Sequence, residues 1–133
     1  MIYTSYYGNR TIPDEAFKVQ ISSSKPEGYK VDLVWKSVAP DYDTLVSPIK
    51  SGRITEKAYT NLYLRQLSKT KAIGNFFEIL RRAGKRDVFL LCYCRKDAFC
   101  HRHILADWLN EKTHREIVEY DSGQPEVKEL SLF

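Results

Sequence analysis

The chain has 133 residues, of which 43% are hydrophobic and 29% are charged, and its net charge is +4. This length fits one domain over residues 1–133, and the balance excludes intrinsic disorder, a fibrous repeat and a disulfide-rich mini-protein. The longest strongly apolar run, residues 88–92, is far shorter than the roughly 20 residues of a membrane helix. Residues 1–7 lack the basic start and apolar centre of a signal peptide. We therefore expect a soluble protein that is not bound to a membrane.

Four short segments have the composition of β-strands or extended chain. They are rich in β-branched and aromatic residues, or they alternate between apolar and polar residues as half-buried strands do. These segments are residues 1–7, 17–22, 29–35 and 116–120. After the last of them we expect a turn at residues 121–125 and then an edge strand or a surface segment at residues 127–133.

Two consecutive helices are expected in the middle of the chain. Pro40 and Pro48 predict irregular structure before them. Apolar residues then recur at helical spacing in two stretches over residues 55–83, which is more typical of a core face than of a ligand site. Thr55 is the expected N-cap of the first helix, and Gly84 is the expected C-cap of the second.

The most apolar segment, residues 86–94, is expected to be a buried central strand, and a helix should follow from residue 100 or 101 to about residue 112. Strand–helix–strand order predicts an α/β protein, a small Rossmann-like three-layer domain with a mostly parallel sheet and helices on both faces. Ligands of such sheets bind at the carboxyl ends of the strands. The site is therefore expected where residues 1–7 and 86–94 end.

All three cysteines lie within nine residues, at Cys92, Cys94 and Cys100, and His101 and His103 follow at once. An odd and clustered set is unlike a disulfide framework and indicates a reducing compartment, so we expect a cytoplasmic protein. Cys92 and Cys94 are two positions apart on the expected strand and should point to the same face. Cys92 taken alone is best explained as a small buried hydrophobe.

The cysteine cluster favours a thiol enzyme that needs no cofactor. Cys100 is expected at a helix N-terminus, where unpaired amides lower the pKa of a thiol. We expect Cys94 or Cys100 to be the nucleophile or proton donor, His101 the base and Arg102 an anion clamp. Cysteine phosphatases have a similar strand–loop–helix layout, but their arginine follows the cysteine by six positions. Arg102 stands eight positions after Cys94, so a phosphatase is not predicted.

A metal site is the alternative use of the same residues. Zinc or iron takes four such ligands, which could come from Cys92, Cys94, Cys100 and either His101 or His103. Common zinc pairs have two to four residues between their cysteines, and Cys92 and Cys94 have one. A metal-free site is therefore the preferred interpretation.

Hydroxyl, aromatic and basic side chains elsewhere are candidates for ligand binding, although β-propensity and core packing explain most of them equally well. The candidates are Thr4, Ser5, Tyr6, Tyr7, Arg10, Tyr59 and Tyr63. The net charge of +4 permits an anionic small molecule or a nucleic acid as partner. The densest basic cluster, residues 81–86, is explained as well by a solvated helix end.

Several segments resemble the domain-of-unknown-function 488 (DUF488) family. The residues that carry the resemblance are Leu90-Leu91-Cys92-Tyr93-Cys94, Phe99-Cys100-His101-Arg102, Ala106-Asp107-Trp108-Leu109 and, more weakly, residues 3–7 and 58–63. The resemblance implies a small α/β domain with a Cys-His-Arg site. The family pattern commonly has a glutamate where this chain has Cys94, so a thiol replaces a candidate carboxylate. The Cys-x-Cys strand followed by Cys-His is also similar to the related DUF4326 family.

Members of these families are suggested to act in nucleotide or nucleic-acid metabolism, often in mobile elements. The resemblance and the cysteine cluster together predict an enzyme that acts on a nucleotide, a nucleoside or a nucleic-acid end. Two alternatives stay open. One is a binding protein for a nucleotide or small anion without catalysis, and the other is a structural metal-binding or nucleic-acid-binding module.

Overall fold

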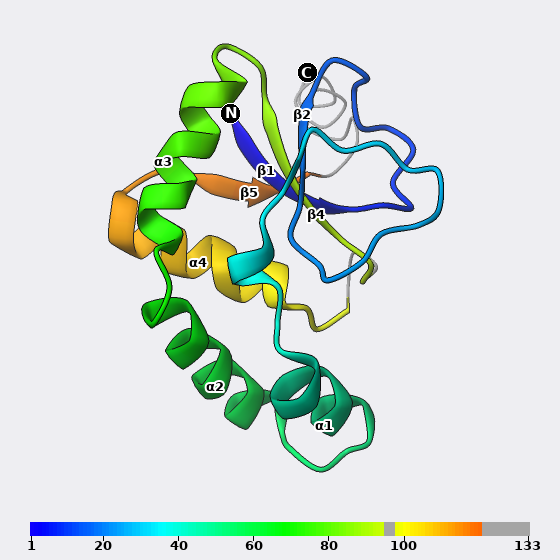
Figure 1. The fold of residues 1–133 in the computed structure, drawn as a ribbon, viewed down its shortest axis with the longest axis vertical. Coiled ribbons are helices and arrows are strands. Elements are labelled where there is room, and N and C mark those ends of the chain that lie inside the picture. The colour runs from blue at the N-terminus through cyan, green and yellow to red at the C-terminus, as the bar shows by residue number, and fades with distance from the viewer. Residues whose placement is uncertain (95–97, 121–133) are drawn as a thin grey trace, which may run out of the picture.

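The structure is a computed structural model that describes residues 1–94 and 98–120, and it contains a sheet of five parallel strands (Figure 1). In chain order the strands are β1 (Ile2–Tyr6), β2 (Phe17–Gln20), β3 (Leu33–Val34), β4 (Val88–Cys92) and β5 (Ile117–Glu119). Their order across the sheet is β3-β2-β4-β1-β5. The turn and tail expected at residues 121–125 and 127–133 lie outside the described residues.

Strand β4 is the buried central strand that its apolar sequence predicts. All five of its residues are buried, and it pairs in parallel with both β1 and β2. Tyr6 of β1 stands opposite Cys92 of β4, so the two strands end at the same edge of the sheet. The third expected strand is shorter than predicted. Only Leu33 and Val34 pair with β2 as a strand, after a turn at Gly28, where φ is +83°.

In the residues that the structure describes, four α-helices accompany the sheet: α1 (Ser47–Lys50), α2 (Glu56–Ser68), α3 (Ala72–Ala83) and α4 (His101–Thr113). The segment before α2 contains a 3-10 turn at Lys36–Val38 and a π-helical turn at Tyr42–Val46, in agreement with the irregular structure expected around the prolines. The Thr55 hydroxyl accepts a hydrogen bond from the Ala58 amide at 3.1 Å, which confirms the predicted N-cap. Gly84 ends α3 with φ +63°, which confirms the predicted C-cap.

The main core lies between one face of the sheet and helices α2, α3 and α4. It joins Val88, Leu90 and Cys92 of β4 to buried residues of all three helices. Figure 1 shows α3 and α4 against the sheet, with α1 and α2 below α4. None of the helices in the described part of the chain is long and apolar enough to cross a bilayer.

The opposite face of the sheet is covered by connecting segments. Phe89 and Leu91 pack there against Tyr7, Ile12 and Ala16 from the β1–β2 connection. Helices were expected on both faces, but the described residues place helices α2–α4 on one face and loops on the other. The segment from Ser22 to Gly28 explains this in part, because it is rich in serine and lacks apolar residues at helical spacing. The three-layer α/β class is confirmed, whereas a closer likeness to Rossmann folds stays a prediction.

Candidate functional site

The three cysteines meet where β4 ends and α4 begins. Their sulfur atoms all lie within 4.8 Å of one another, and the Cys92 and Cys100 sulfurs are 2.9 Å apart. Cys92 and Cys100 are buried, whereas Cys94 is half-buried. Cys92 and Cys94 point to the same face of the sheet as predicted, since both pack with the main core. Cys100 is the N-cap residue of α4 and has an extended backbone, so the predicted start of the helix is confirmed.

The thiol that carries negative charge most readily is Cys94. Hydrogen bonds from the Cys100 and Cys92 thiols hold its pKa well below the usual range. For Cys100, the interactions with the Cys92 and Cys94 thiols, together with burial, raise the pKa. The prediction of a lowered Cys100 pKa is therefore wrong, because the helix N-terminus is outweighed by burial and by two neighbouring sulfurs. Cys92 has its pKa raised to about 11, since its bond to Cys94 and its burial outweigh the Cys100 contact.

His101 is buried and held in one tautomer. Its Nε2 lies 2.8 Å from the Ile21 carbonyl oxygen, which can only accept, so Nε2 carries the proton. The Nδ1 lone pair therefore faces the Cys100 sulfur, 3.6 Å away. Burial lowers the pKa of His101 to about 4, and the ring is neutral at pH 7. At pH 7 the Nδ1 atom of His101 is therefore a hydrogen-bond acceptor that faces the Cys100 sulfur.

Arg102 is buried completely, with 0% of its surface exposed. Its Nη1 donates to the Cys92 sulfur at 3.0 Å and to the Cys94 carbonyl oxygen at 2.6 Å. Its Nε and Nη2 donate to the two carboxylate oxygens of Glu119, both at 3.0 Å. An anion clamp needs an accessible guanidinium, so these surroundings speak against the predicted role. Arg102 instead positions the thiols by tying the end of β4 to β5.

Glu119 is a site residue that the sequence analysis missed. It accepts the bidentate pair from Arg102 and a hydrogen bond from the Thr4 hydroxyl at 2.7 Å. His103 stands nearby, with Nδ1 3.9 Å from Glu119 Oε1. A signal was present in the sequence. Alternation along residues 117–119 puts Glu119 on the same side as Ile117, and an inward glutamate needs a cationic partner.

Most of the seven ligand-binding candidates are held inside the protein. Thr4 bonds Glu119, Ser5 accepts from the Asn9 amide, and Tyr63 donates to the Val38 carbonyl at 2.6 Å. The Tyr7 hydroxyl bonds Ser22 at 2.7 Å, and burial raises its pKa to about 12. These four side chains have protein partners and little exposed surface.

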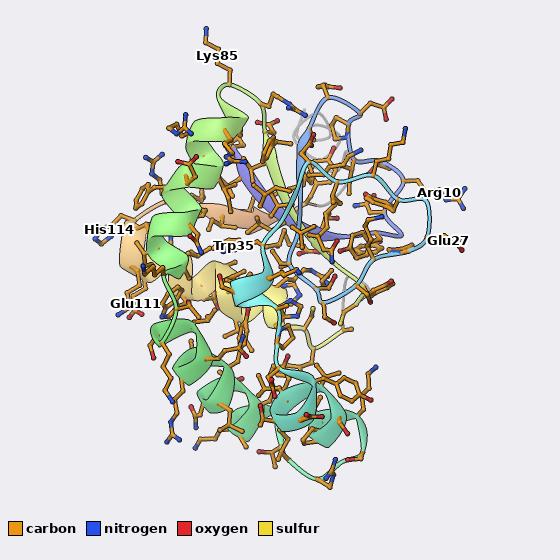
Figure 2. The ribbon with its side chains drawn as sticks, viewed as in Figure 1. Arg10, Glu27, Trp35, Lys85, Glu111 and His114 are labelled. Atoms are coloured by element: carbon orange, nitrogen blue, oxygen red, sulfur yellow. The ribbon has the colours of Figure 1, made fainter. Side chains whose placement is uncertain are left out.

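The other three candidates occupy different places. Tyr6 is half-buried, with the Arg102 guanidinium 5.7 Å from its ring centre. Tyr59 lines a cavity in front of the thiols. Arg10 is exposed in the loop after β1, where Figure 2 shows it pointing away from the sheet.

The cavity in front of the thiols has a volume of about 650 Å³. All three cysteines and His101 line one side of it, and the Ser22–Ser24 segment and Lys50 line others. Aromatic rings also line it, and several are unusually exposed: Tyr42 by 61%, Tyr93 by 50% and Phe99 by 36%. Tyr42 and Lys50 were not predicted, because the irregular segment that carries them has no periodic pattern.

A second, smaller hollow of about 320 Å³ lies beside Tyr7. It is lined by three cationic side chains, Arg10, Lys18 and Lys30, and by the rings of Tyr7 and Tyr29. The Tyr93 ring, which lines the cavity, contacts the Tyr7 ring, which lines this hollow, at 5.1 Å between centres. By contrast, the basic residues 81–86 sit at the opposite edge of the sheet, before β4, and Figure 2 shows Lys85 pointing away from the molecule.

The residues able to hold a metal are the three cysteines. Within the described ranges 1–94 and 98–120 they are the one group of three or more ligand atoms that lie close together. His101 and His103, which were possible fourth ligands, do not join that group. His101 Nε2 is bonded to Ile21, and His103 lies beside Glu119.

Comparison with known proteins identifies one family whose model matches this sequence. The model of DUF488-N3a, described as the active DUF488-N3 subclade, matches residues 2–113. This span includes all three cysteines, His101 and Arg102. No curated protein and no solved structure gives a significant match. The relation to the DUF4326 family stays a prediction. Because the match spans most of the chain, the protein belongs to the DUF488 family.

Proposed function

We propose that the protein is a cysteine-dependent enzyme whose nucleophile is Cys94. The observation that carries this proposal is the position of Cys94, which is half-buried, opens onto a cavity and has two buried cysteines within 4.8 Å of its sulfur. A thiolate is the reactive form of cysteine, and hydrogen bonds from neighbouring thiols favour that form. The description of the matching family as an active subclade is consistent with this role.

The lining of the cavity supports a nucleotide-like substrate. Tyr42, Tyr93 and Phe99 offer exposed ring surface against which a planar base can pack. Lys50 lies in the same lining, and the second hollow adds Arg10 and two lysines for phosphate groups. Neither Arg10, Lys18 nor Lys30 forms an ion pair within residues 1–94 and 98–120. These side chains favour a nucleotide whose base lies in the cavity and whose phosphate lies in the basic hollow.

His101 and Arg102 support the nucleophile from behind in this proposal. Neutral His101 presents its Nδ1 lone pair to the Cys100 sulfur and keeps its Nε2 proton on the Ile21 carbonyl, so it fixes the position of Cys100 beside the nucleophile. Arg102 fixes the Cys94 backbone and the Cys92 sulfur and is held by Glu119. Cys94 then attacks an electrophilic atom of the substrate and displaces its leaving group, as in covalent catalysis by other cysteines.

Alkylation of the folded, reduced protein with iodoacetamide tests the nucleophile. We expect Cys94 to be labelled first, at a rate whose half-maximum lies well below pH 8.5, the ordinary pKa of cysteine, because its thiolate is stabilised. Peptide mass spectrometry identifies the labelled residue. Cys94→Ser should leave two buried thiols that react only after unfolding. Labelling of Cys94 with an ordinary pH dependence, or preferential labelling of Cys100, would contradict the assignment.

The substrate class is tested by protection. AMP should slow the alkylation of Cys94 more than adenosine or inorganic phosphate alone, because it fills both hollows. Lys50→Glu and Arg10→Glu should weaken this protection, whereas Lys69→Glu, at the end of α2 and outside both linings, should not. Equal protection by all three probes, or none, would argue against a nucleotide.

A metal centre is a second candidate, favoured by the three convergent sulfurs. With Zn–S bonds of about 2.3 Å, tetrahedral sulfur ligands lie about 3.8 Å apart. The three sulfurs lie within 4.8 Å of one another, and those of Cys92 and Cys100, now 2.9 Å apart, would have to separate to hold zinc. The cavity would leave the fourth position open to a solvent or substrate ligand. If zinc binds, one equivalent should raise the melting temperature of the reduced protein and protect Cys94 from iodoacetamide. Cys94→Ser should lose the zinc-dependent stabilisation, and an unchanged melting temperature of the native chain would exclude this candidate.

A further inference from the structure

The three thiols differ in their access to solvent, and this difference suggests that they have different roles in one reaction. Cys92 is 1% exposed and Cys100 is 3% exposed, and their sulfurs are 2.9 Å apart. Cys94 is half-buried and lines the cavity. A small oxidant in the cavity therefore meets Cys94 first, while the closest sulfur pair lies behind it.

We infer that the cluster is a redox-active centre that reduces a hydroperoxide at Cys94 and stores the oxidation as a Cys92–Cys100 disulfide. A disulfide bond is about 2.05 Å long, so the two buried sulfurs need to approach by less than 1 Å. The inference shares the reactive Cys94 thiolate with the proposed function, and it does not depend on a nucleotide substrate.

The reaction has three balanced steps. The Cys94 thiolate attacks one oxygen of hydrogen peroxide, the O–O bond breaks, and Cys94 becomes a sulfenic acid while hydroxide leaves. Cys100 then attacks the Cys94 sulfur, and its thiol proton leaves with the departing hydroxide as water. This forms a Cys94–Cys100 disulfide. Finally Cys92 attacks the Cys100 sulfur, Cys94 leaves as a thiolate, and the Cys92 proton neutralises the first hydroxide.

The net result is that one peroxide and two thiols give one disulfide and two waters, with Cys94 regenerated. Arg102 assists the last step, because its Nη1 donates to the Cys92 sulfur and favours the thiolate form that attacks. A dithiol such as dithiothreitol would return the pair to its reduced state. Cys94 is thus the residue that reacts with the peroxide, and the resulting disulfide forms between the two buried cysteines, away from solvent.

The test is oxidation of the reduced protein by one equivalent of hydrogen peroxide. We expect free thiols, counted in urea, to fall from the three of the reduced chain to one, with a mass loss of two hydrogen atoms. Peptide mapping after acid quench should identify a Cys92–Cys100 disulfide and an unmodified Cys94. Three remaining thiols, or a final disulfide that includes Cys94, would overturn the inference.

Two variants assign the steps. Cys94→Ser keeps the buried pair but should form its disulfide at least about tenfold more slowly, because buried thiols react poorly with peroxide. Cys100→Ser removes the resolving thiol, and a dimedone-reactive sulfenic acid should then accumulate on Cys94. Circular dichroism of each variant before oxidation verifies the fold. Oxidation of Cys94→Ser at the native rate would contradict entry through Cys94.

Failure of this inference can be told from failure of the proposed function. If iodoacetamide labels Cys94 with a low-pH profile but peroxide leaves three thiols, only the redox centre is excluded. If the labelling profile is ordinary while the disulfide still forms through Cys94, the nucleophile proposal fails and the redox assignment stands.

Discussion

Replacing Arg102 by alanine is expected to lower the free energy of unfolding by about 3–5 kcal/mol, the range for breaking one partner of a buried ion pair. The guanidinium is 0% exposed and binds both oxygens of Glu119, whose side chain is 21% exposed. Removing it leaves that carboxylate without its cation and with the Thr4 hydroxyl as its remaining side-chain donor among these contacts. It also leaves the Cys94 carbonyl without its donor. Urea unfolding, followed by circular dichroism, measures the loss.

A matched control is available on the surface. Arg81 pairs with Glu78 on α3, but both side chains are largely exposed, so Arg81→Ala should change stability far less. Glu119→Gln combined with Arg102→Ala should recover part of the loss, because the unpaired charge is then absent. If Arg102→Ala and Arg81→Ala unfold at the same urea concentration, the buried pair does not hold the two strands together as described.

The second large effect is a loss of stability in mild acid that originates at His101. Its folded pKa is about 4, below the ordinary value of 6.5, so between these values the unfolded chain binds a proton that the folded chain does not. Stability therefore falls as the pH drops from about 6.5 to 4. The magnitude is on the order of 3 kcal/mol, at about 1.4 kcal/mol for each unit of pKa. Urea unfolding at half-unit intervals of pH measures this slope.

The difference between the native chain and His101→Asn isolates this residue, because the amide of asparagine can donate to the Ile21 carbonyl but does not titrate. Other groups also contribute to the slope. The pKa values of His103 and Cys94 are lowered too, and each adds a loss in the same direction as the pH falls. His114→Asn, at an exposed position, should keep the full native slope. An equal slope in His101→Asn and the native chain would show that the ring is not held neutral.

The residues of the second half of the chain allowed much of this architecture to be predicted. The apolar run 88–92 indicated the central strand, and a polar pair at a helix start indicated that His101 and Arg102 have buried partners. These inferences succeeded because they depend on local periodicity and on the cost of burying polar groups. The cysteine cluster could also be predicted, because its three members are close in sequence.

The features of the site that were not predicted depend on contacts between segments that are far apart in the sequence. Arg102 was expected to bind an anionic ligand, but its partner is the carboxylate of Glu119, 17 positions later on another strand. The position of Cys100 at a helix N-terminus suggested a lowered pKa. The direction of the pKa shift depends instead on how the three sulfurs share their protons, which only the fold determines. Lys50 and Tyr42 reach the cavity from an irregular segment, where neither helical nor strand periodicity marks an inward side.

The position of β4 between β1 and β2 has a consequence for synthesis on the ribosome. The first strand made cannot bond its central neighbour until residues 88–92 have emerged, and the Met1 ammonium pairs with Asp87, 86 positions away. Its other neighbour, β5, emerges later still. Until residues 88–92 have emerged, β1 therefore lacks both of its neighbours and β2 can pair only with β3. The thiol cluster and its Arg102–Glu119 brace assemble last, so a truncated product would lack the site rather than contain a weakened one.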